Sequence, residues 1–284
     1  MIQGRRVVIT GLGILCPLGN DIDSTWENIK SGLSGASNIT KFDASNFSTT
    51  FAAELKDYKS ISGLSEKETR RIDPFIQYAI TATDQAILDS GLNFDQTDTT
   101  RVGVSIGSGI GGLGSIEDNS LILDEKGPRR ISPFFVPGAI INMASGNVAI
   151  KHKLMGPNIS IVSACSSAAH SIGFSARSIA YGDADVMITG GSEAAITPLG
   201  LAGFNASKAL STNNDNPQGA SCPWDKNRDG FLLGEGAGIL ILEEYESAKN
   251  RSAKIYGEII GFGMSDDAYH ITAPSEDGRG ATLA

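Results

Sequence analysis

Hydrophobic and polar positions along the chain follow the pattern of an α/β protein. Short apolar and β-branched runs, each suited to a buried strand, occur at Arg5–Thr10, Arg101–Ile106, Asn158–Ala164, Asp185–Thr189 and Ala237–Leu242. The first run is expected to close at Gly11-Leu12-Gly13, and the second at a glycine cluster, residues 107–114. Because strands separated by helices usually lie side by side, the pattern predicts a mainly parallel sheet covered on both faces.

Two helices are predicted from their ends as well as from their spacing. Asp73 supplies an N-cap and Pro74 the first helical residue, after which apolar residues recur at helical spacing until Gly91. Residues 165–181 are mostly small and are predicted as a buried helix that ends at Gly182.

Near its C-terminal end the sequence begins two elements without continuing them. Lys254–Gly263 has the composition of another strand, and Gly278–Ala284 that of the opening of a helix. A strand and a helix with nothing after them would leave apolar surface uncovered. We therefore expect these 284 residues to be the first part of a longer protein.

Composition and charge narrow the class of protein. Apolar residues make up 40% of the chain and the mean hydropathy is −0.05, as expected of a protein with a core. The net charge of −9 argues against a nucleic-acid partner. No run approaches the length of a membrane span. Arg5 and Arg6 before an apolar stretch and Cys16 resemble a lipoprotein signal, but two glycines interrupt the stretch and bulky Leu15 precedes the cysteine. With three scattered cysteines, we expect a protein of the reducing cytoplasm.

Three ligand-like patterns fail on their details. Residues 107–112 match the GxGxxG pattern, but the region about 20 residues on, where a dinucleotide site needs an acidic residue, contains Arg129 and Arg130. We interpret these glycines as letting the loop pass close to another backbone or to a bound chain. Residues 225–230 are similar to half an EF-hand, but Glu235 comes one residue too early for calcium. The three histidines share no spacing suited to zinc.

Cys165 is the strongest candidate for chemistry. It stands where an apolar strand is predicted to turn into a helix, and a helix N-terminus offers unpaired N–H groups and a positive dipole end that favour a thiolate nucleophile. A buried, inert cysteine is the alternative on this evidence alone. His170 lies five residues later, about 140° round the helix, so a Cys–His pair is not expected. Cys16 and Cys222 have no comparable setting.

Longer motifs carry a resemblance to a known family. Val162-Ser-Ala-Cys-Ser-Ser-Ala-Ala-His-Ser-Ile-Gly173 resembles the nucleophile segment of the β-ketoacyl-acyl-carrier-protein synthases of bacterial type II fatty acid synthesis. Further matching stretches begin at Val8, Ile106, Ser132, Tyr181, Pro223 and Leu233, and the resemblance runs in order from Ile2 to Ala284. It implies a thiolase-like layered α/β fold, in which residues 1–252 form the N-terminal half with a five-stranded mixed sheet and helices on both faces. Residues 253–284 would begin an incomplete C-terminal half.

The resemblance also implies a reaction and its partners. Cys165 would take an acyl chain from an acyl carrier protein, its backbone N–H would serve as an oxyanion donor, and the carbanion from malonyl carrier protein would attack the acyl-enzyme. The resemblance implies no cofactor or metal, and it implies that the protein forms a homodimer. Two catalytic histidines and a lysine of the family would lie beyond Ala284, so we expect condensation by these 284 residues alone to fail.

Residues matched to binding roles fall into two groups. The acyl pocket and its mouth would include Ile110, Phe134, Phe204, His270 and Thr272, with Ile110 at the floor of the pocket and Phe134 near the dimer interface. Carrier docking would involve Lys67, Arg70, Arg71, Arg129, Arg130 and Lys208. A capping box, Ser65 and Glu68, would begin a short helix and place Lys67, Arg70 and Arg71 in its first turns on one face.

Two other classes of function remain open at this stage. A non-catalytic partner subunit similar to a chain-length factor would have a replaced nucleophile, whereas Cys165 is intact. A thiol hydrolase would need a histidine within hydrogen-bond distance of Cys165, which a structure can test.

Overall fold

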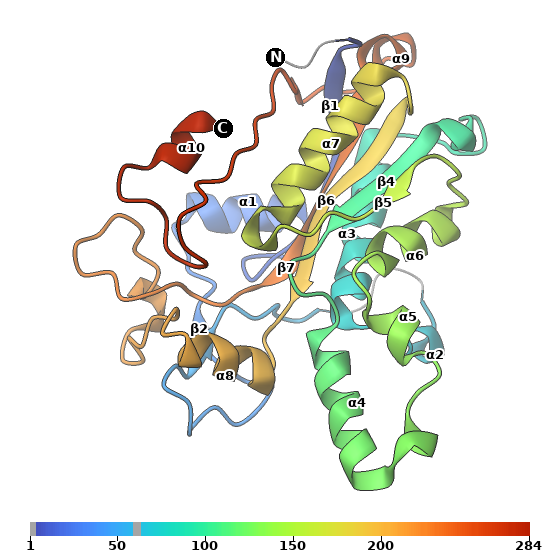
Figure 1. Ribbon diagram of the computed structural model, residues 1–284. Coiled ribbons are helices and arrows are strands. Elements are labelled where there is room, and N and C mark those ends of the chain that lie inside the picture. The colour runs from blue at the N-terminus through green and yellow to red at the C-terminus, as the bar shows by residue number, and fades with distance from the viewer. Residues whose placement is uncertain (1–3, 59–63) are drawn as a thin grey trace.

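A computed structural model describes residues 4–58 and 64–284, so Ile2, where the family resemblance begins, lies outside the described residues. Its centre is a sheet of six strands in the order β5-β4-β6-β7-β1-β8 (Figure 1). The strands are β1 (Val7–Leu15), β4 (Val102–Gly107), β5 (Asn158–Ile159), β6 (Val186–Ala194), β7 (Glu235–Glu244) and β8 (Gly257–Glu258). A small separate sheet pairs β2 (Ser37–Asn38) with β3 (Phe51–Ala52).

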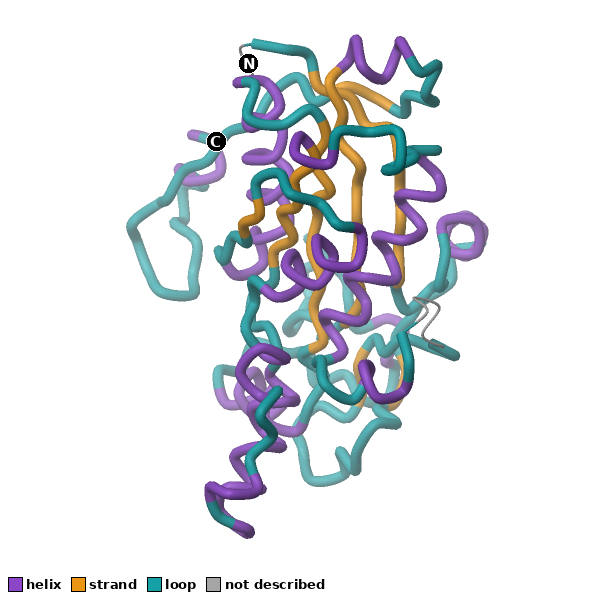
Figure 2. Tube along the Cα trace, turned by 90° about the vertical axis from the view of Figure 1, so that its right-hand side faces the viewer, coloured by secondary structure: helices purple, strands orange, loops and turns teal. Residues whose placement is uncertain are grey.

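Helices cover both faces of the large sheet, which lies as a layer between them (Figure 2). One face carries α3 (Pro74–Ser90) and α6 (Met143–His152), and the other carries α7 (Ser167–Tyr181). The remaining helices are α1 (Ile22–Lys30), α2 (Glu66–Thr69), α4 (Leu113–Lys126), α5 (Phe135–Ala139), α8 (Pro198–Ala206), α9 (Tyr245–Asn250) and α10 (Arg279–Leu283). Short 3₁₀ turns lie at Thr99–Arg101, Pro128–Arg130, Ala164–Ser166 and Pro217–Gly219.

The direction of the strands corrects one prediction. β5, β4 and β6 are parallel, but β7 is antiparallel to β6, β1 to β7 and β8 to β1, so the mainly parallel sheet inferred from the pattern is wrong. The mixed sheet implied by the family resemblance is confirmed, with a sixth short strand, β8. The pattern misled because the long connection from β6 to β7, which contains α8, returns the chain beside β6 in the opposite direction.

The glycines after Thr10 do not end the first strand, as the sequence suggested. β1 continues through Gly11 and Gly13 to Leu15, with its register against β7 shifted between Ile9 and Gly11. A Cβ at Gly11 would collide with the carbonyl oxygen of Ala86, and one at Gly13 with that of Ala82. These glycines therefore allow α3 to lie directly on the strand.

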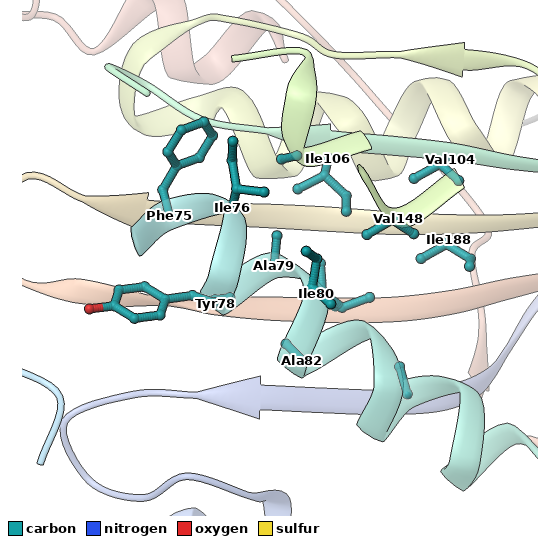
Figure 3. Close-up of a cluster of buried hydrophobic side chains, with 14 of the residues drawn as sticks. Phe75, Ile76, Tyr78, Ala79, Ile80, Ala82, Val104, Ile106, Val148 and Ile188 are labelled. Carbon is teal, nitrogen blue, oxygen red and sulfur yellow. The ribbon is translucent and has the colours of Figure 1, made fainter. Parts of the chain in front are cut away.

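The helix α3 forms as predicted and anchors the main core. The Asp73 side chain accepts the N–H of Phe75, Pro74 occupies the first turn, and Gly91 ends the helix in the left-handed region at φ 64°. Its buried residues Phe75, Ile76, Ala79 and Ile80 pack with Val104, Ile106, Val148 and Ile188 from β4, α6 and β6 (Figure 3). This packing forms the hydrophobic core on the face of the sheet opposite α7.

Two predicted strands are much shorter in the structure. β5 comprises only Asn158 and Ile159, and the following residues leave the sheet before reaching Cys165. In the segment 254–263 only Gly257 and Glu258 pair with β1, and the chain then runs as a long loop outside the sheet to α10 (Figures 1 and 2).

Candidate active site

Cys165 lies in the 3₁₀ turn Ala164–Ser166, which leads directly into α7, and the residue is exposed. Ala164 just before it has φ 51°, a left-handed conformation that is uncommon for a residue other than glycine. The Ser167 hydroxyl accepts the N–H of Ser163 (2.9 Å) and donates to the carbonyl of Ala164 (2.7 Å). The sharp bend is thus held by the first residue of the helix, and it presents the thiol at the helix start, as predicted.

An open cavity of about 680 Å³ lies beside this thiol. Its walls come from the ends of β1, β4 and β6, the start of β7, and the turn with Cys165, and most of the lining is glycine or apolar. Phe204 and Phe231 close one part with their rings edge to face, 5.3 Å between centroids. The predicted alternative of a buried, inert cysteine does not fit an exposed thiol at the edge of an apolar cavity.

Glycines bring the cavity walls together at this point. A Cβ at Gly107 would lie 2.6 Å from the carbonyl oxygen of Ser167, and one at Gly191 2.6 Å from the Cβ of Ala168. A Cβ at Gly112 would lie 2.5 Å from the Cα of Ala139. The prediction that the glycine cluster passes close to another backbone is therefore confirmed.

Two carboxylates, Glu193 and Glu235, line this mostly apolar cavity. Glu235 is buried, forms an ion pair with Lys41 and accepts the N–H of Leu55 at 2.8 Å. The Tyr78 hydroxyl lies 3.5 Å from Glu235, and burial together with this carboxylate raises the pKa of Tyr78 well above its ordinary value. Glu235 is thus held by structural partners.

The carboxylate of Glu193 was not singled out in the sequence. It lies four residues beyond the predicted strand Asp185–Thr189, and in the structure it belongs to β6. It accepts hydrogen bonds from Ser108, Gly109 and Ile110, the loop after β4. The available indication was an acidic residue four positions after the predicted strand Asp185–Thr189, because the segments that follow strands commonly carry functional side chains.

The histidines have partners other than the thiol. His170 Nδ1 lies 2.6 Å from Ser163 Oγ, and its ring packs edge to face on Phe262. His152 Nε2 lies 3.1 Å from an Asp84 carboxylate oxygen. In the described part of the chain, therefore, the geometry gives no support to the Cys–His pair that a thiol hydrolase needs.

The predicted pocket residues lie in three places. Ile110 and Phe204 line the cavity beside Cys165, and Ile110 also lines a second, apolar groove of about 440 Å³. Phe134 precedes α5, where the Arg71 guanidinium lies 4.2 Å from the centre of its ring. His270 and Thr272 lie in the exposed loop before α10, where His270 Nδ1 accepts the N–H of Thr272, and neither lines the cavity. Their place at the pocket mouth stays a prediction.

The predicted docking residues lie on the surface near α2, α4 and α8. The capping box of Ser65 and Glu68 is present, although α2 has only four residues. Arg70 is exposed and its guanidinium lies 3.4 Å from Glu66, whereas Arg71 is partly covered by Phe134. The other members of the set are also exposed: Lys67 on α2, Arg129 and Arg130 after α4, and Lys208 after α8.

Two features are absent from the described residues. Across residues 4–58 and 64–284, no three or more His, Cys, Asp or Glu side chains are grouped so as to hold a metal ion. In the same part of the chain, no helix has both the length and the apolar character needed to cross a membrane.

The fold agrees with comparisons to known proteins. Residues 4–248 match the family model for the beta-ketoacyl synthase N-terminal domain. The chain therefore belongs to the β-ketoacyl synthase family, ketosynthases of the acyltransferase class of enzymes. It is 59% identical over 280 residues to 3-oxoacyl-[acyl-carrier-protein] synthase 2 of Vibrio harveyi, and 57% identical over 281 residues to the protein of that name in Coxiella burnetii.

Each of these two relatives is longer than the chain. The matches cover 99% of this chain and 68% of the relative. Among solved structures, a beta-ketoacyl synthase from Burkholderia phymatum matches with a TM-score of 0.89 at 32% identity, over 99% of this chain and 69% of that one. A type II PKS ketosynthase in complex with its acyl-carrier protein, bound to the hexaketide, matches with a TM-score of 0.88 at 33% identity, over 99% and 68%.

Proposed function

We propose that this protein is a 3-oxoacyl-[acyl-carrier-protein] synthase that lengthens fatty acyl chains by two carbons. The observation that carries the proposal is the exposed Cys165, on a sharply bent turn at the start of α7 and beside an apolar cavity. An apolar cavity suits an acyl chain, and an exposed thiol at a helix start suits a nucleophile.

The reaction proceeds in two covalent stages. The Cys165 thiolate attacks the thioester carbon of an acyl carrier protein, the carbon–sulfur bond to the carrier breaks, and the carrier leaves as its thiol. Malonyl carrier protein then loses carbon dioxide, and the resulting carbanion attacks the acyl carbon bound to Cys165. That step releases the cysteine as thiolate and yields a 3-oxoacyl carrier protein. The backbone N–H of Cys165 serves as one donor to the oxyanion in both stages.

The acyl chain occupies the cavity beside Cys165, with Ile110 at its floor and Phe204 in its wall. Ile110 lines both this cavity and the neighbouring groove, so its side chain separates the two spaces. Its size and position would then limit how far an acyl chain can extend.

The active form is a homodimer. The groove next to Ile110 is lined by Phe135, Val136 and Ile140, and nearby apolar residues of the β5 edge, Ile159 and Val162, are exposed. A second copy would cover this apolar face, and Phe134 would lie near the interface. Sedimentation of the protein at micromolar concentration tests this, with a monomer as the contrary result.

The carrier protein docks on the exposed cations near α2, α4 and α8. The structural relative in complex with an acyl-carrier protein supports such an interaction. Lys67 and Arg70 are the most accessible members on α2, because Arg71 stacks on Phe134. We place the reaction in the cytoplasm, where type II fatty acid synthesis would supply both carrier substrates.

Residues 1–252 form the half that bears the nucleophile, and residues 253–284 begin the second half. The family resemblance assigns malonyl decarboxylation to two histidines and a lysine. His152, His170 and His270 have other partners. The two catalytic histidines and the lysine would therefore come from the part of the relatives that the chain does not match.

The test is product formation from acyl and malonyl carrier proteins, followed by mass spectrometry. The protein expressed from its complete reading frame should form the 3-oxoacyl carrier protein, and Cys165→Ala should abolish acylation while Cys222→Ala retains it. The 284-residue polypeptide should form no condensation product. Product formation by Cys165→Ala would contradict the proposed mechanism, and turnover by the 284-residue polypeptide would contradict the need for further histidines.

A further inference from the structure

Glu193 is a charged side chain in a cavity that is otherwise mostly apolar, and the reaction described above gives it no task. It lies near the end of β6, opposite Gly236 of β7, on the face of the sheet that carries α7. A carboxylate placed beside an acyl cavity costs free energy unless its oxygens are hydrogen-bonded. Its partners therefore indicate its role.

Among the described residues, the hydrogen-bond partners of Glu193 all belong to the loop that follows β4. One carboxylate oxygen, Oε1, accepts the hydroxyl of Ser108 at 3.0 Å. The other, Oε2, accepts the N–H of Gly109 at 2.7 Å and that of Ile110 at 3.2 Å. The Ser108 oxygen in turn accepts the N–H of Gly111 at 3.1 Å. One side chain thus holds three consecutive backbone N–H groups, two directly and one through a hydroxyl.

This loop touches both parts of the proposed acyl site. A Cβ at Gly109 would lie 3.3 Å from the carbonyl oxygen of Ala164, the residue before the nucleophile. Ile110 stands between the cavity beside Cys165 and the second groove. A shift of the loop would therefore move the Ile110 side chain between the two spaces. The identity of the residues that line the acyl cavity would stay the same.

We infer that Glu193 is a positioning residue that sets acyl chain-length selectivity by fixing the loop of Ser108, Gly109 and Ile110. The selectivity part rests on the function proposed above, whereas the fixing of the loop does not. A glycine-rich loop has little conformational preference of its own, so a single conformation needs an external anchor. The carboxylate supplies it, because it offers acceptors alone to a loop that presents three donors.

Three substitutions separate the role of the side chain from a general loss of structure. Glu193→Ala removes every acceptor, and Glu193→Gln keeps one oxygen but turns an amide donor toward Ser108. Ser108→Ala removes only the bond to Oε1 and the bond from Gly111. The matched control is Glu54→Gln, since Glu54 likewise accepts two backbone N–H groups and a hydroxyl, from Thr40 and Lys41, but does not line the cavity.

The first measurement is hydrogen exchange of a peptide covering residues 107–112, in the protein from its complete reading frame. Glu193→Ala should speed exchange of the Gly109 and Ile110 amides by about tenfold or more, with a smaller change for Glu193→Gln and none for Glu54→Gln. Unchanged exchange in a folded Glu193→Ala protein would overturn the inference. If Glu193→Ala does not fold, Glu193→Gln and Ser108→Ala decide the matter by the same criterion.

The second measurement is the rate of Cys165 acylation by a short and a long acyl carrier protein. The ratio of the two rates should change by about fivefold or more in Glu193→Ala, while alkylation of Cys165 by iodoacetamide changes less than twofold. An unchanged ratio, or an equal change in Glu54→Gln, would overturn the role in selectivity. Failure of the unmodified protein to be acylated at all would instead contradict the proposed function, and the exchange result would still decide whether Glu193 fixes the loop.

Discussion

Replacing Gly107 by alanine should disturb the contact between the end of β4 and the start of α7. A Cβ at this position would lie 2.6 Å from the carbonyl oxygen and 2.7 Å from the carbonyl carbon of Ser167. Ordinary carbon contacts are about 3.5–4 Å, so the strand and the helix must separate by roughly 1 Å. The obstacle is backbone, which cannot rotate aside as a flexible side chain can.

The expected loss of stability follows from the cost of overfilling a packed interior, about 1–3 kcal/mol. For a chain of this size, that loss corresponds to a melting temperature about 2–12 °C lower. Because Ser167 also holds the Ala164 bend, the rate of Cys165 alkylation should change as well. Gly203→Ala in α8 is the matched control, since nothing lies within 4 Å of the added Cβ. There, alanine should be neutral or stabilising by up to about 1 kcal/mol. A melting temperature for Gly107→Ala equal to that of the unmodified protein would refute the reasoning.

Three further outcomes are expected. Iodoacetamide at neutral pH should label Cys165 before Cys16 or Cys222, because only Cys165 is exposed, and peptide mapping that finds equal labelling would contradict this. Ile110→Phe should slow acylation by long acyl carrier proteins about tenfold or more while sparing short ones, and an unchanged profile would remove Ile110 from the pocket. Lys67→Glu with Arg70→Glu should weaken carrier binding at low salt and flatten its salt dependence. Lys249→Glu with Lys254→Glu, an equal change of charge near α9, should not, and equal effects of both pairs would argue against a docking surface at α2.

The elements with local end signals were the ones that the sequence predicted well. Asp73, Pro74 and Gly91 bound α3 because a cap, a fixed φ and a left-handed residue act within one turn. Gly182 ends α7 in the same way, at φ 92°. Such end signals act through residues that are close in sequence. The helix ends that they predict therefore do not depend on how distant parts of the chain pack.

Elements that depend on distant partners were predicted less well. The apolar run at Asn158–Ala164 indicated a buried strand, yet Ile159 and Val162 are 43% and 54% exposed and only two residues pair with β4. An apolar pattern cannot distinguish residues buried in the core from apolar residues that stay at the surface of the chain. The glycines of β1 were misread for a related reason, since their role is set by the backbone of α3.

The same distinction between local and distant signals applies to the candidate site. Cys165 could be identified because the turn and the helix that position it are contiguous in sequence. Glu193 could not be assigned a partner, because the loop that it holds precedes it by more than 80 residues. Only the parallel pairing of β4 with β6 brings the two together.

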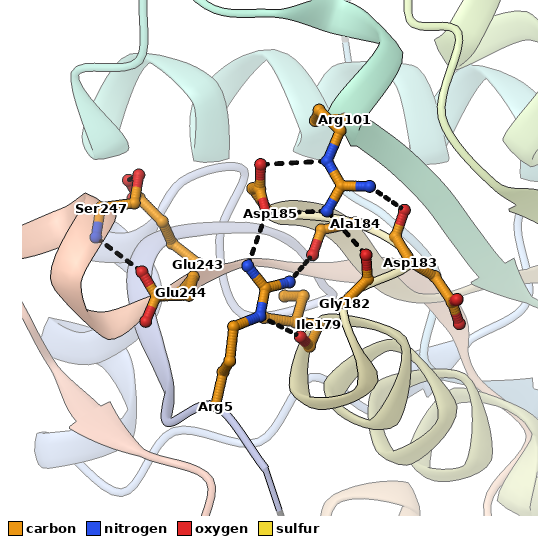
Figure 4. A network of polar contacts seen from close by, with 10 residues as sticks. All are labelled: Arg5, Arg101, Ile179, Gly182, Asp183, Ala184, Asp185, Glu243, Glu244 and Ser247. Carbon is orange, nitrogen blue, oxygen red and sulfur yellow. Dashed lines mark hydrogen bonds and ion pairs between the residues drawn. The ribbon is translucent and has the colours of Figure 1, made fainter.

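That pairing of β4 with β6 is also tied at its other end by a cluster of charges. Asp185, just before β6, accepts hydrogen bonds from Arg5 and from Arg101, just before β4 (Figure 4). The two guanidinium groups also donate to backbone carbonyls of Ile179, Gly182, Asp183 and Ala184 at the end of α7. The hydrogen bonds from Arg101, followed by those from Arg5, hold the pKa of Asp185 below its ordinary 3.8.

A lowered pKa in the folded state means that the ionised carboxylate stabilises the fold above pH 3.8, and that this contribution is lost as the pH falls through the folded-state pKa. Side chains one third exposed are partly screened, so Asp185→Asn should cost only about 1 kcal/mol at pH 7. The difference in unfolding free energy between the two proteins should shrink as the pH falls below about 4, as urea titrations can show. Asp183→Asn is the control, because Arg101 bonds to its main-chain carbonyl. A difference that is constant with pH would mean that Asp185 acts through packing and not through its charge.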